Sequence, residues 1–196
     1  MSVLLIDNYD SFTYNVLHLL RDSGCTQVEV VRNDALDLGA LPSYRAVVAS
    51  PGPSLPQDAG ELLQAVEVCL DAKVPYLGIC LGHQALGQIL GLELLPLEQV
   101  QHGIQDSCEL VENNDLTHGV PSQFDIGRYH SWHVKMPSTS DTVRAFAKTS
   151  DGVVQAISAT QAPAYGLQFH PESIMTQSVG TMLIHNFLQA KASPYA

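Results

Sequence analysis

Positive charge is scarce in this sequence. Its 196 residues include nine lysines and arginines against twenty aspartates and glutamates, which gives a formal net charge of -11. A protein that binds nucleic acid or an anionic membrane needs clustered cations to neutralise phosphate groups. This chain has too few cations for such a cluster, so we expect no nucleic acid and no membrane as a partner. The acidic excess is typical of a solvated surface.

Cysteine is also rare, and no two cysteines form a CxxC pair. The four cysteines are Cys25, Cys69, Cys80 and Cys108. Zinc sites and small disulfide frameworks depend on closely spaced cysteines, and the histidines lack metal-ligand spacing as well. We therefore expect no metal, no cofactor and four reduced thiols, as in a cytoplasmic protein.

Long apolar runs are absent too. No run approaches the about 18 residues that span a bilayer. The first run, Val3 to Ile6, ends at Asp7 and is too short for the core of a secretory signal, with no basic leader before it. With 45% hydrophobic and 15% charged residues, the composition is that of a globular protein. The length corresponds to about 1.3 average domains, so we predict one domain over residues 1–196.

The first half of the chain alternates short apolar runs with helical periodicity. Strands are predicted at 3–6, 28–32, 46–49 and 76–79, and helices at 10–20, 59–70 and 81–91. We expect Asp10 or Ser11 to cap the first helix. Short, fully apolar strands separated by helices are typical of a parallel sheet that is covered on both faces.

The second half is dominated by short strands joined by turns. They are predicted near 92–95, 107–111, 124–129, 143–147, 153–157 and 164–169, followed by a helix at 179–188 and a tail at 191–196. The sequence therefore predicts an α/β fold: an open, mostly parallel twisted sheet covered by helices, with an antiparallel extension.

Cys80 is a candidate nucleophile. Gly78 and Gly82 lie two residues to either side of it, at the junction of a predicted strand and helix. Glycines at this spacing leave room for the sharp turn of a nucleophile elbow. The partial positive charge of a helix start favours thiolate over thiol. The alternative is a buried structural cysteine, because free cysteine is often found in protein cores.

His170 and Glu172 are a candidate base and its orienting carboxylate. They follow the predicted strand at 164–169 and flank Pro171, which stiffens the backbone. Residues two apart in an extended segment point the same way, so Glu172 can orient the imidazole while His170 faces Cys80. The alternative is a strand-end histidine beside an unrelated surface glutamate. Nucleophile, base and orienter together make a complete set for acyl transfer.

Several motifs together resemble the class I glutamine amidotransferases. These motifs are Leu5 to Asn15, Ser50 to Pro53, Cys80 to Gln84, His102-Gly103, Arg128 to Ser131 and His170 to Glu172. They cover essentially the whole chain in order, and are most similar to the small subunits of anthranilate synthase and aminodeoxychorismate synthase. The resemblance implies a flavodoxin-like fold and glutaminase activity.

The resemblance also implies a reaction for the three residues already singled out. Cys80 attacks the side-chain amide of L-glutamine, ammonia leaves, and water hydrolyses the glutamyl thioester to glutamate. His170 serves as general base and then acid, and Glu172 orients it.

Further residues are assigned to the substrate by the same resemblance. Backbone N–H groups of Leu81 and of the loop formed by Gly52, Pro53 and Ser54 are expected to form an oxyanion hole. Gln84 and the backbone at Ser131 and Trp132 match positions that hold the amino-acid part of glutamine.

The sequence departs from the family pattern at three positions. Ser54 stands where the family usually has glycine, Ile104 where relatives often have lysine, and Trp132 where leucine is common. Ser54 and Trp132 lie in the proposed glutamine pocket, so its detailed shape is open. If position 54 needs a left-handed backbone, serine there costs about 1–2 kcal/mol.

A chain of this size leaves no room for the enzyme that uses the ammonia. The resemblance implies a larger chorismate-binding synthase subunit as partner, with anthranilate synthase favoured and aminodeoxychorismate synthase as the alternative. Two further alternatives are a γ-glutamyl hydrolase on the same fold and a catalytically silent binding subunit.

Overall fold

A nine-stranded sheet forms the centre of the protein. The computed structural model describes residues 2–97, 100 and 102–190, so the predicted tail at 191–196 lies outside the described residues. The strand order is β2-β1-β3-β4-β11-β10-β9-β6-β7. The first five in this order are parallel: β2 (Val28–Arg32), β1 (Val3–Asp7), β3 (Ala46–Ala49), β4 (Tyr76–Ile79) and β11 (Ala164–Leu167).

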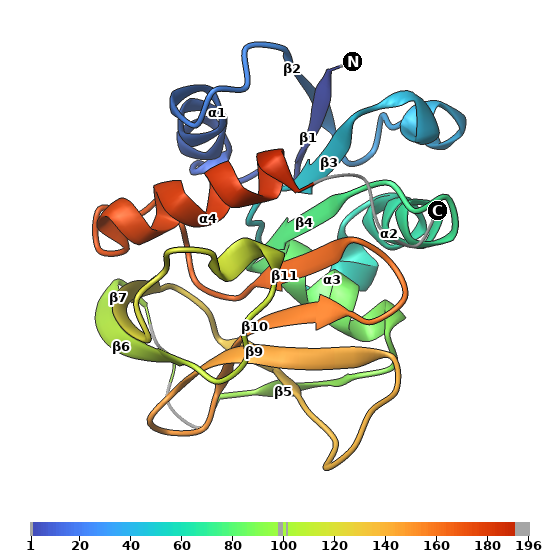
Figure 1. The fold of residues 1–196 in the computed structure, drawn as a ribbon. Coiled ribbons are helices and arrows are strands. Elements are labelled where there is room, and N and C mark those ends of the chain that lie inside the picture. The colour runs from blue at the N-terminus through green and yellow to red at the C-terminus, as the bar shows by residue number, and fades with distance from the viewer. Residues whose placement is uncertain (1, 98–99, 101, 191–196) are drawn as a thin grey trace.

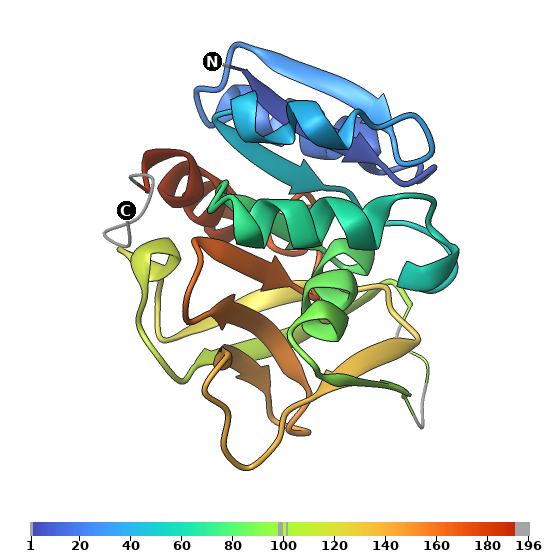
Figure 2. The ribbon, with the colours of Figure 1, turned by 90° about the vertical axis from the view of Figure 1, so that its right-hand side faces the viewer.

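Helices cover both faces of the parallel part, as Figures 1 and 2 show. They are α1 (Thr13–Asp22), α2 (Leu62–Asp71), α3 (Leu81–Ile89) and α4 (Gln177–Gln189). Leu20 of α1 and Phe187 of α4 share one apolar core with Leu5 of β1. Leu62 of α2 and Leu86 of α3 belong to the core on the opposite face. The interior strands are apolar on both sides because each side is covered, which confirms the predicted class of sheet.

The same sheet continues as an antiparallel extension. Its strands are β10 (Val154–Ala159), β9 (Val143–Thr149), β6 (Ile104–Leu110) and β7 (Gln123–Arg128). A separate two-stranded sheet pairs β5 (Glu93–Pro96) with β8 (Trp132–Lys135). The sequence did not predict β8, because its mixture of polar and apolar residues carries little strand signal. The strand β8 forms because it pairs with β5.

The first helix begins later than predicted. α1 starts at Thr13, after Phe12 as its N-cap, and no side chain caps it. Asp10 instead accepts a hydrogen bond from the Phe12 N–H at 2.7 Å. The expectation of a cap from Asp10 or Ser11 was therefore wrong. Asp10 therefore holds the turn that leads into the helix, next to Phe12.

Within the described ranges, no helix is long and apolar enough to cross a bilayer.

Candidate active site

Cys80 lies in a strained turn between β4 and α3. Its backbone has φ 50° and ψ −96°, a left-handed conformation that a residue with a side chain rarely adopts. A Cβ on Gly78 would overlap the Gly82 carbonyl and lie 2.6 Å from the His83 nitrogen. A Cβ on Gly82 would lie 2.8 Å from the Ala49 Cβ. Both glycines are therefore required by close backbone approach, and the turn is the elbow that their spacing predicts.

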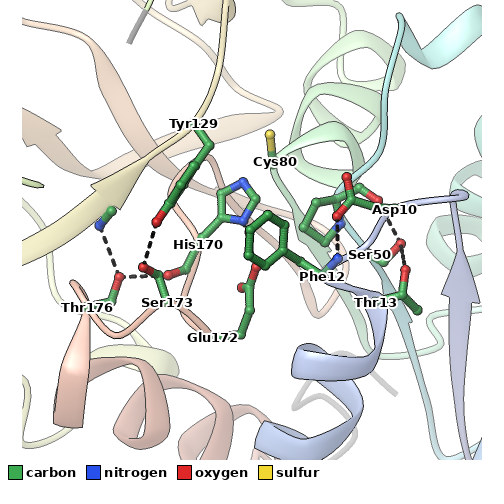
Figure 3. A network of polar contacts seen from close by, with 12 residues as sticks. Asp10, Phe12, Thr13, Ser50, Cys80, Tyr129, His170, Glu172, Ser173 and Thr176 are labelled. Atoms are coloured by element: carbon green, nitrogen blue, oxygen red, sulfur yellow. Dashed lines mark hydrogen bonds and ion pairs between the residues drawn. The ribbon is translucent and has the colours of Figure 1, made fainter. Parts of the chain in front are cut away.

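The register of β4 and β11 brings the two halves of the site together. These strands are parallel, and Ile79 pairs with Leu167. The Cys80 N–H extends this pairing by donating to the Leu167 carbonyl at 2.7 Å. Parallel strands end at the same edge of a sheet. His170, which comes after β11, therefore lies close to Cys80, which comes directly after β4. Figure 3 shows the His170 ring between Cys80 and Glu172.

His170 and Glu172 form a buried pair. The His170 Nδ1 lies 2.6 Å from the Glu172 Oε1, and their side chains are 4% and 1% exposed. Burial alone would lower the pKa of His170, but the Cys80 sulfur and the Glu172 carboxylate outweigh it and raise that pKa to about 10. The imidazole of His170 is therefore protonated and positively charged at neutral pH, next to the sulfur of Cys80.

Aromatic rings and backbone contacts hold the His170 ring in place. The Tyr129 and Phe12 rings lie 4.7 Å and 5.7 Å from it, centroid to centroid (Figure 3). The Thr176 hydroxyl donates to the His170 carbonyl at 2.7 Å and accepts from the Gly127 N–H at 3.1 Å. Sequence reasoning noted Phe12 and Tyr129 only as parts of motifs, and their packing on His170 was not predicted.

The predicted oxyanion loop packs directly against the elbow. A Cβ on Gly52 would overlap the Leu81 side chain and lie 2.7 Å from the Asn8 Cβ. Asn8 fixes the loop by two hydrogen bonds to Ser50, one from its backbone N–H to the hydroxyl at 3.0 Å and one from its side-chain amide to the carbonyl at 2.7 Å. Leu81 is the first residue of α3, where N–H groups have no partner within the helix. The structure thus brings Gly52 and Leu81 together beside Cys80.

Pro53 and Ser54 lie farther out on this loop, where both are exposed. Ser54 has φ 71°, so this position does adopt the left-handed backbone that glycine tolerates best.

Replacing Ser54 by glycine should stabilise the fold and leave catalysis nearly unchanged. We expect Ser54→Gly to raise the free energy of unfolding by about 1 kcal/mol, because the left-handed strain is relieved. Glutamine turnover should change less than about tenfold, which is under about 1.4 kcal/mol of barrier, since the Gly52 and Leu81 donors remain. Denaturant titration and glutamate release measure the two quantities. A hundredfold gain in turnover would show instead that Ser54 weakens the oxyanion hole.

Gln84 and the Trp132 backbone are brought together as well. The Gln84 Nε2 donates to the Trp132 carbonyl at 3.1 Å, and the His130 Nδ1 lies 2.9 Å from the same oxygen. The carbonyl of Ser131 accepts from the Leu97 N–H at 2.8 Å. Both of these carbonyls therefore have partners within the protein, which fixes the backbone of this segment next to Gln84.

Gln168 is a residue at this site that sequence reasoning missed. Its side chain is completely buried, and its Nε2 lies 3.6 Å from the Cys80 sulfur. A signal was present, because Gln168 precedes His170 by two residues, as His170 precedes Glu172, and residues at this spacing share a face.

Two further buried histidines near the site are uncharged at neutral pH. Burial lowers the pKa of His83 to about 3 and that of His130 to about 4. Both imidazoles are therefore neutral, in contrast to His170.

Across the part of the chain that the structure describes, no group of three or more histidine, cysteine, aspartate or glutamate side chains is arranged to hold a metal ion.

Comparison with known proteins points to a family. Residues 4–190 match the family "Glutamine amidotransferase class-I". Anthranilate synthase component 2 of Azospirillum brasilense is 38% identical over 95% of this chain and 94% of that protein. Aminodeoxychorismate/anthranilate synthase component 2 of Bacillus subtilis is 35% identical over 95% of each. A solved glutamine amidotransferase from Thermotoga maritima has the same fold, with a TM-score of 0.78 at 18% identity over 96% of each chain. This chain belongs to the class I glutamine amidotransferase family.

Proposed function

We propose that residues 1–196 act as one glutaminase domain, with Cys80 as nucleophile, His170 as proton carrier and Glu172 as its orienter. The observation that supports this most directly is the buried His170–Glu172 contact of 2.6 Å beside the elbow cysteine. Each of the three groups has a task that acyl transfer requires.

The first half-reaction makes the thioester. The Cys80 sulfur attacks the side-chain carbonyl carbon of glutamine, and the N–H groups of Gly52 and Leu81 stabilise the oxyanion. His170, which holds a proton because its pKa is raised to about 10, gives it to the leaving nitrogen. The carbon–nitrogen bond breaks and ammonia departs.

The second half-reaction regenerates the enzyme. His170, now neutral, takes a proton from a water molecule, whose oxygen attacks the thioester carbonyl carbon. The carbon–sulfur bond then breaks, glutamate leaves, and the sulfur returns as thiolate beside protonated His170. Neither half-reaction needs a redox partner or cofactor.

We further propose that the ammonia passes to a larger chorismate-binding synthase subunit in the cytoplasm. Both relatives described above are named as second components of such synthases. Three exposed apolar side chains that are close in sequence to site residues fit a protein partner: Tyr9 and Tyr14, near Phe12, are 51% and 60% exposed, and Ile174, near Glu172, is 87% exposed. Aromatic side chains are enriched at protein–protein interfaces.

Anthranilate synthase is the favoured partner, and aminodeoxychorismate synthase is the second candidate. The Bacillus subtilis relative is named as a component of both synthases, and this supports aminodeoxychorismate synthase as the second candidate.

A reconstitution experiment tests the proposal and separates the two partners. The chain is mixed with the large subunit of either synthase, and glutamate release is measured with and without chorismate. We expect release to rise at least about tenfold with the correct partner and chorismate, because docking aligns the oxyanion loop. Glutamine-dependent formation of anthranilate or of aminodeoxychorismate identifies the partner. Maximal turnover by the chain alone, with no response to either subunit, would contradict the role as a synthase component.

A further inference from the structure

Gln168 lies between the nucleophile and the predicted glutamine pocket. It follows β11 and is completely buried. Its Nε2 is 3.6 Å from the Cys80 sulfur, and its Oε1 is 3.3 Å from the Nε2 of Gln84. Gln84 in turn reaches the Trp132 carbonyl at 3.1 Å. One chain of hydrogen bonds therefore joins the Trp132 backbone, through two side-chain amides, to the sulfur of Cys80.

The direction of this chain is fixed by its far end. A backbone carbonyl can only accept, so Gln84 must present its NH2 group to Trp132. The same NH2 group has a second hydrogen, which points to Gln168, so Gln168 must present its oxygen there. The NH2 group of Gln168 is then directed at the Cys80 sulfur, which is left as the acceptor.

We propose that Gln168 is a further catalytic residue, which donates a hydrogen bond to the thiolate form of Cys80. This inference rests on the proposed role of Cys80 as nucleophile. A donor that faces the sulfur favours the thiolate in the resting site, since hydrogen bonds to charged groups are the stronger ones. It also stabilises the sulfur when the thioester is hydrolysed and the Cys80 thiolate is expelled.

The same hydrogen bonds link the orientation of the Gln168 amide to the predicted substrate-binding residues. Gln84 and Trp132 are the positions expected to contact the amino-acid part of glutamine, and they also set the orientation of the Gln168 amide. A substrate that displaces Gln84 therefore changes the hydrogen bond at the nucleophile.

The test measures alkylation of Cys80 by iodoacetamide in the full chain, read by peptide mapping, because only thiolate reacts. Burial raises the pKa values of Cys69 and Cys108 to about 12, so these thiols stay unreactive at neutral pH. In Gln168→Met, which keeps the side-chain length but has no donor, alkylation at about pH 7 should fall about tenfold. At high pH the deficit should shrink, because a higher pH favours thiolate over thiol in both chains.

Gln155→Met is the matched control. Gln155 is as buried as Gln168 and accepts a backbone hydrogen bond from it at 2.8 Å, but its side-chain amide has no hydrogen-bond partner among the described residues. We expect alkylation within about twofold of the parent at both pH values, since no donor to sulfur is lost.

Gln84→Met provides a second arm if Gln168→Met does not fold. It leaves the Gln168 amide in place but removes the group that sets its direction, so an alkylation loss of about threefold is expected. Normal thermal unfolding shows which variants are folded.

Two results would overturn the role of Gln168: alkylation at the parental rate in the folded variants at neutral pH, or a deficit that persists unchanged at high pH. Glutamate release is measured separately on the parent chain with its partner. If no glutamate is released but alkylation of Cys80 still depends on Gln168, the proposed function is rejected and the hydrogen bond from Gln168 to Cys80 is supported.

Discussion

Cys80→Ser is expected to reduce glutamine-dependent synthesis by the reconstituted complex by at least about 10⁴-fold, the scale typical for loss of a nucleophile. A serine hydroxyl carries no negative charge at neutral pH. The change also removes the sulfur, one of the two groups that raise the pKa of His170, so His170 holds the proton for the leaving nitrogen less firmly. Synthesis from added ammonium salts should be kept, since ammonia then reaches the partner without hydrolysis of glutamine. The two activities are measured on the same preparation.

Cys25→Ser is the control for this experiment. Cys25 is also a buried free thiol, and its sulfur lies 3.7 Å from the Gln27 carbonyl, far from the elbow in the sequence. We expect it to leave both activities unchanged. Survival of glutamine-dependent synthesis in Cys80→Ser would show that another group is the nucleophile.

Gly78→Ala is expected to destroy the elbow. The added methyl group would overlap the Gly82 carbonyl and lie 2.6 Å from the His83 nitrogen. These are backbone atoms in the first turn of α3, so they can move only if the helix shifts away from β4. We expect the free energy of unfolding to fall by more than about 3 kcal/mol, as for severe overpacking, and any folded fraction to lose glutaminase activity.

Gly39→Ala tests whether the effect is specific to the elbow. Gly39 is exposed, and the nearest atom to an added Cβ is the Asp37 Oδ1 at an ordinary contact distance of 3.4 Å. The free energy of unfolding of Gly39→Ala should differ from that of the parent chain by less than about 1 kcal/mol. Denaturant unfolding measures both variants, and similar small changes in the two would show that the predicted overlap is relieved by a backbone shift.

Much of this architecture could be predicted because local patterns and tertiary structure agree. The interior strand β4 is apolar on both faces, and it is indeed covered on both. The spacing of Gly78 and Gly82 around Cys80 encodes the turn directly, because no side chain fits at either glycine. The separation of His170 and Glu172 by two residues also encodes their contact.

Other features could not be predicted because they depend on partners far along the chain. The strand β8 exists through its pairing with β5. Phe12 packs on His170, although more than half of the chain separates them in the sequence, and no periodicity specifies that contact. The left-handed backbone of Ser54 is set by the course of its loop rather than by its residue type.

The position of β11 has a consequence for how the protein is made. This strand is among the last to be synthesised, yet it lies between β4 and β10 in the middle of the sheet. Until it emerges from the ribosome, β4 has an unpaired edge, and such edges invite pairing with other chains. His170 and Glu172 follow directly after this strand. A nascent chain therefore carries the thiol of Cys80 without the groups that use it while the 90 residues up to His170 are added. The insertion of β11 then closes the sheet and completes the catalytic set in one step.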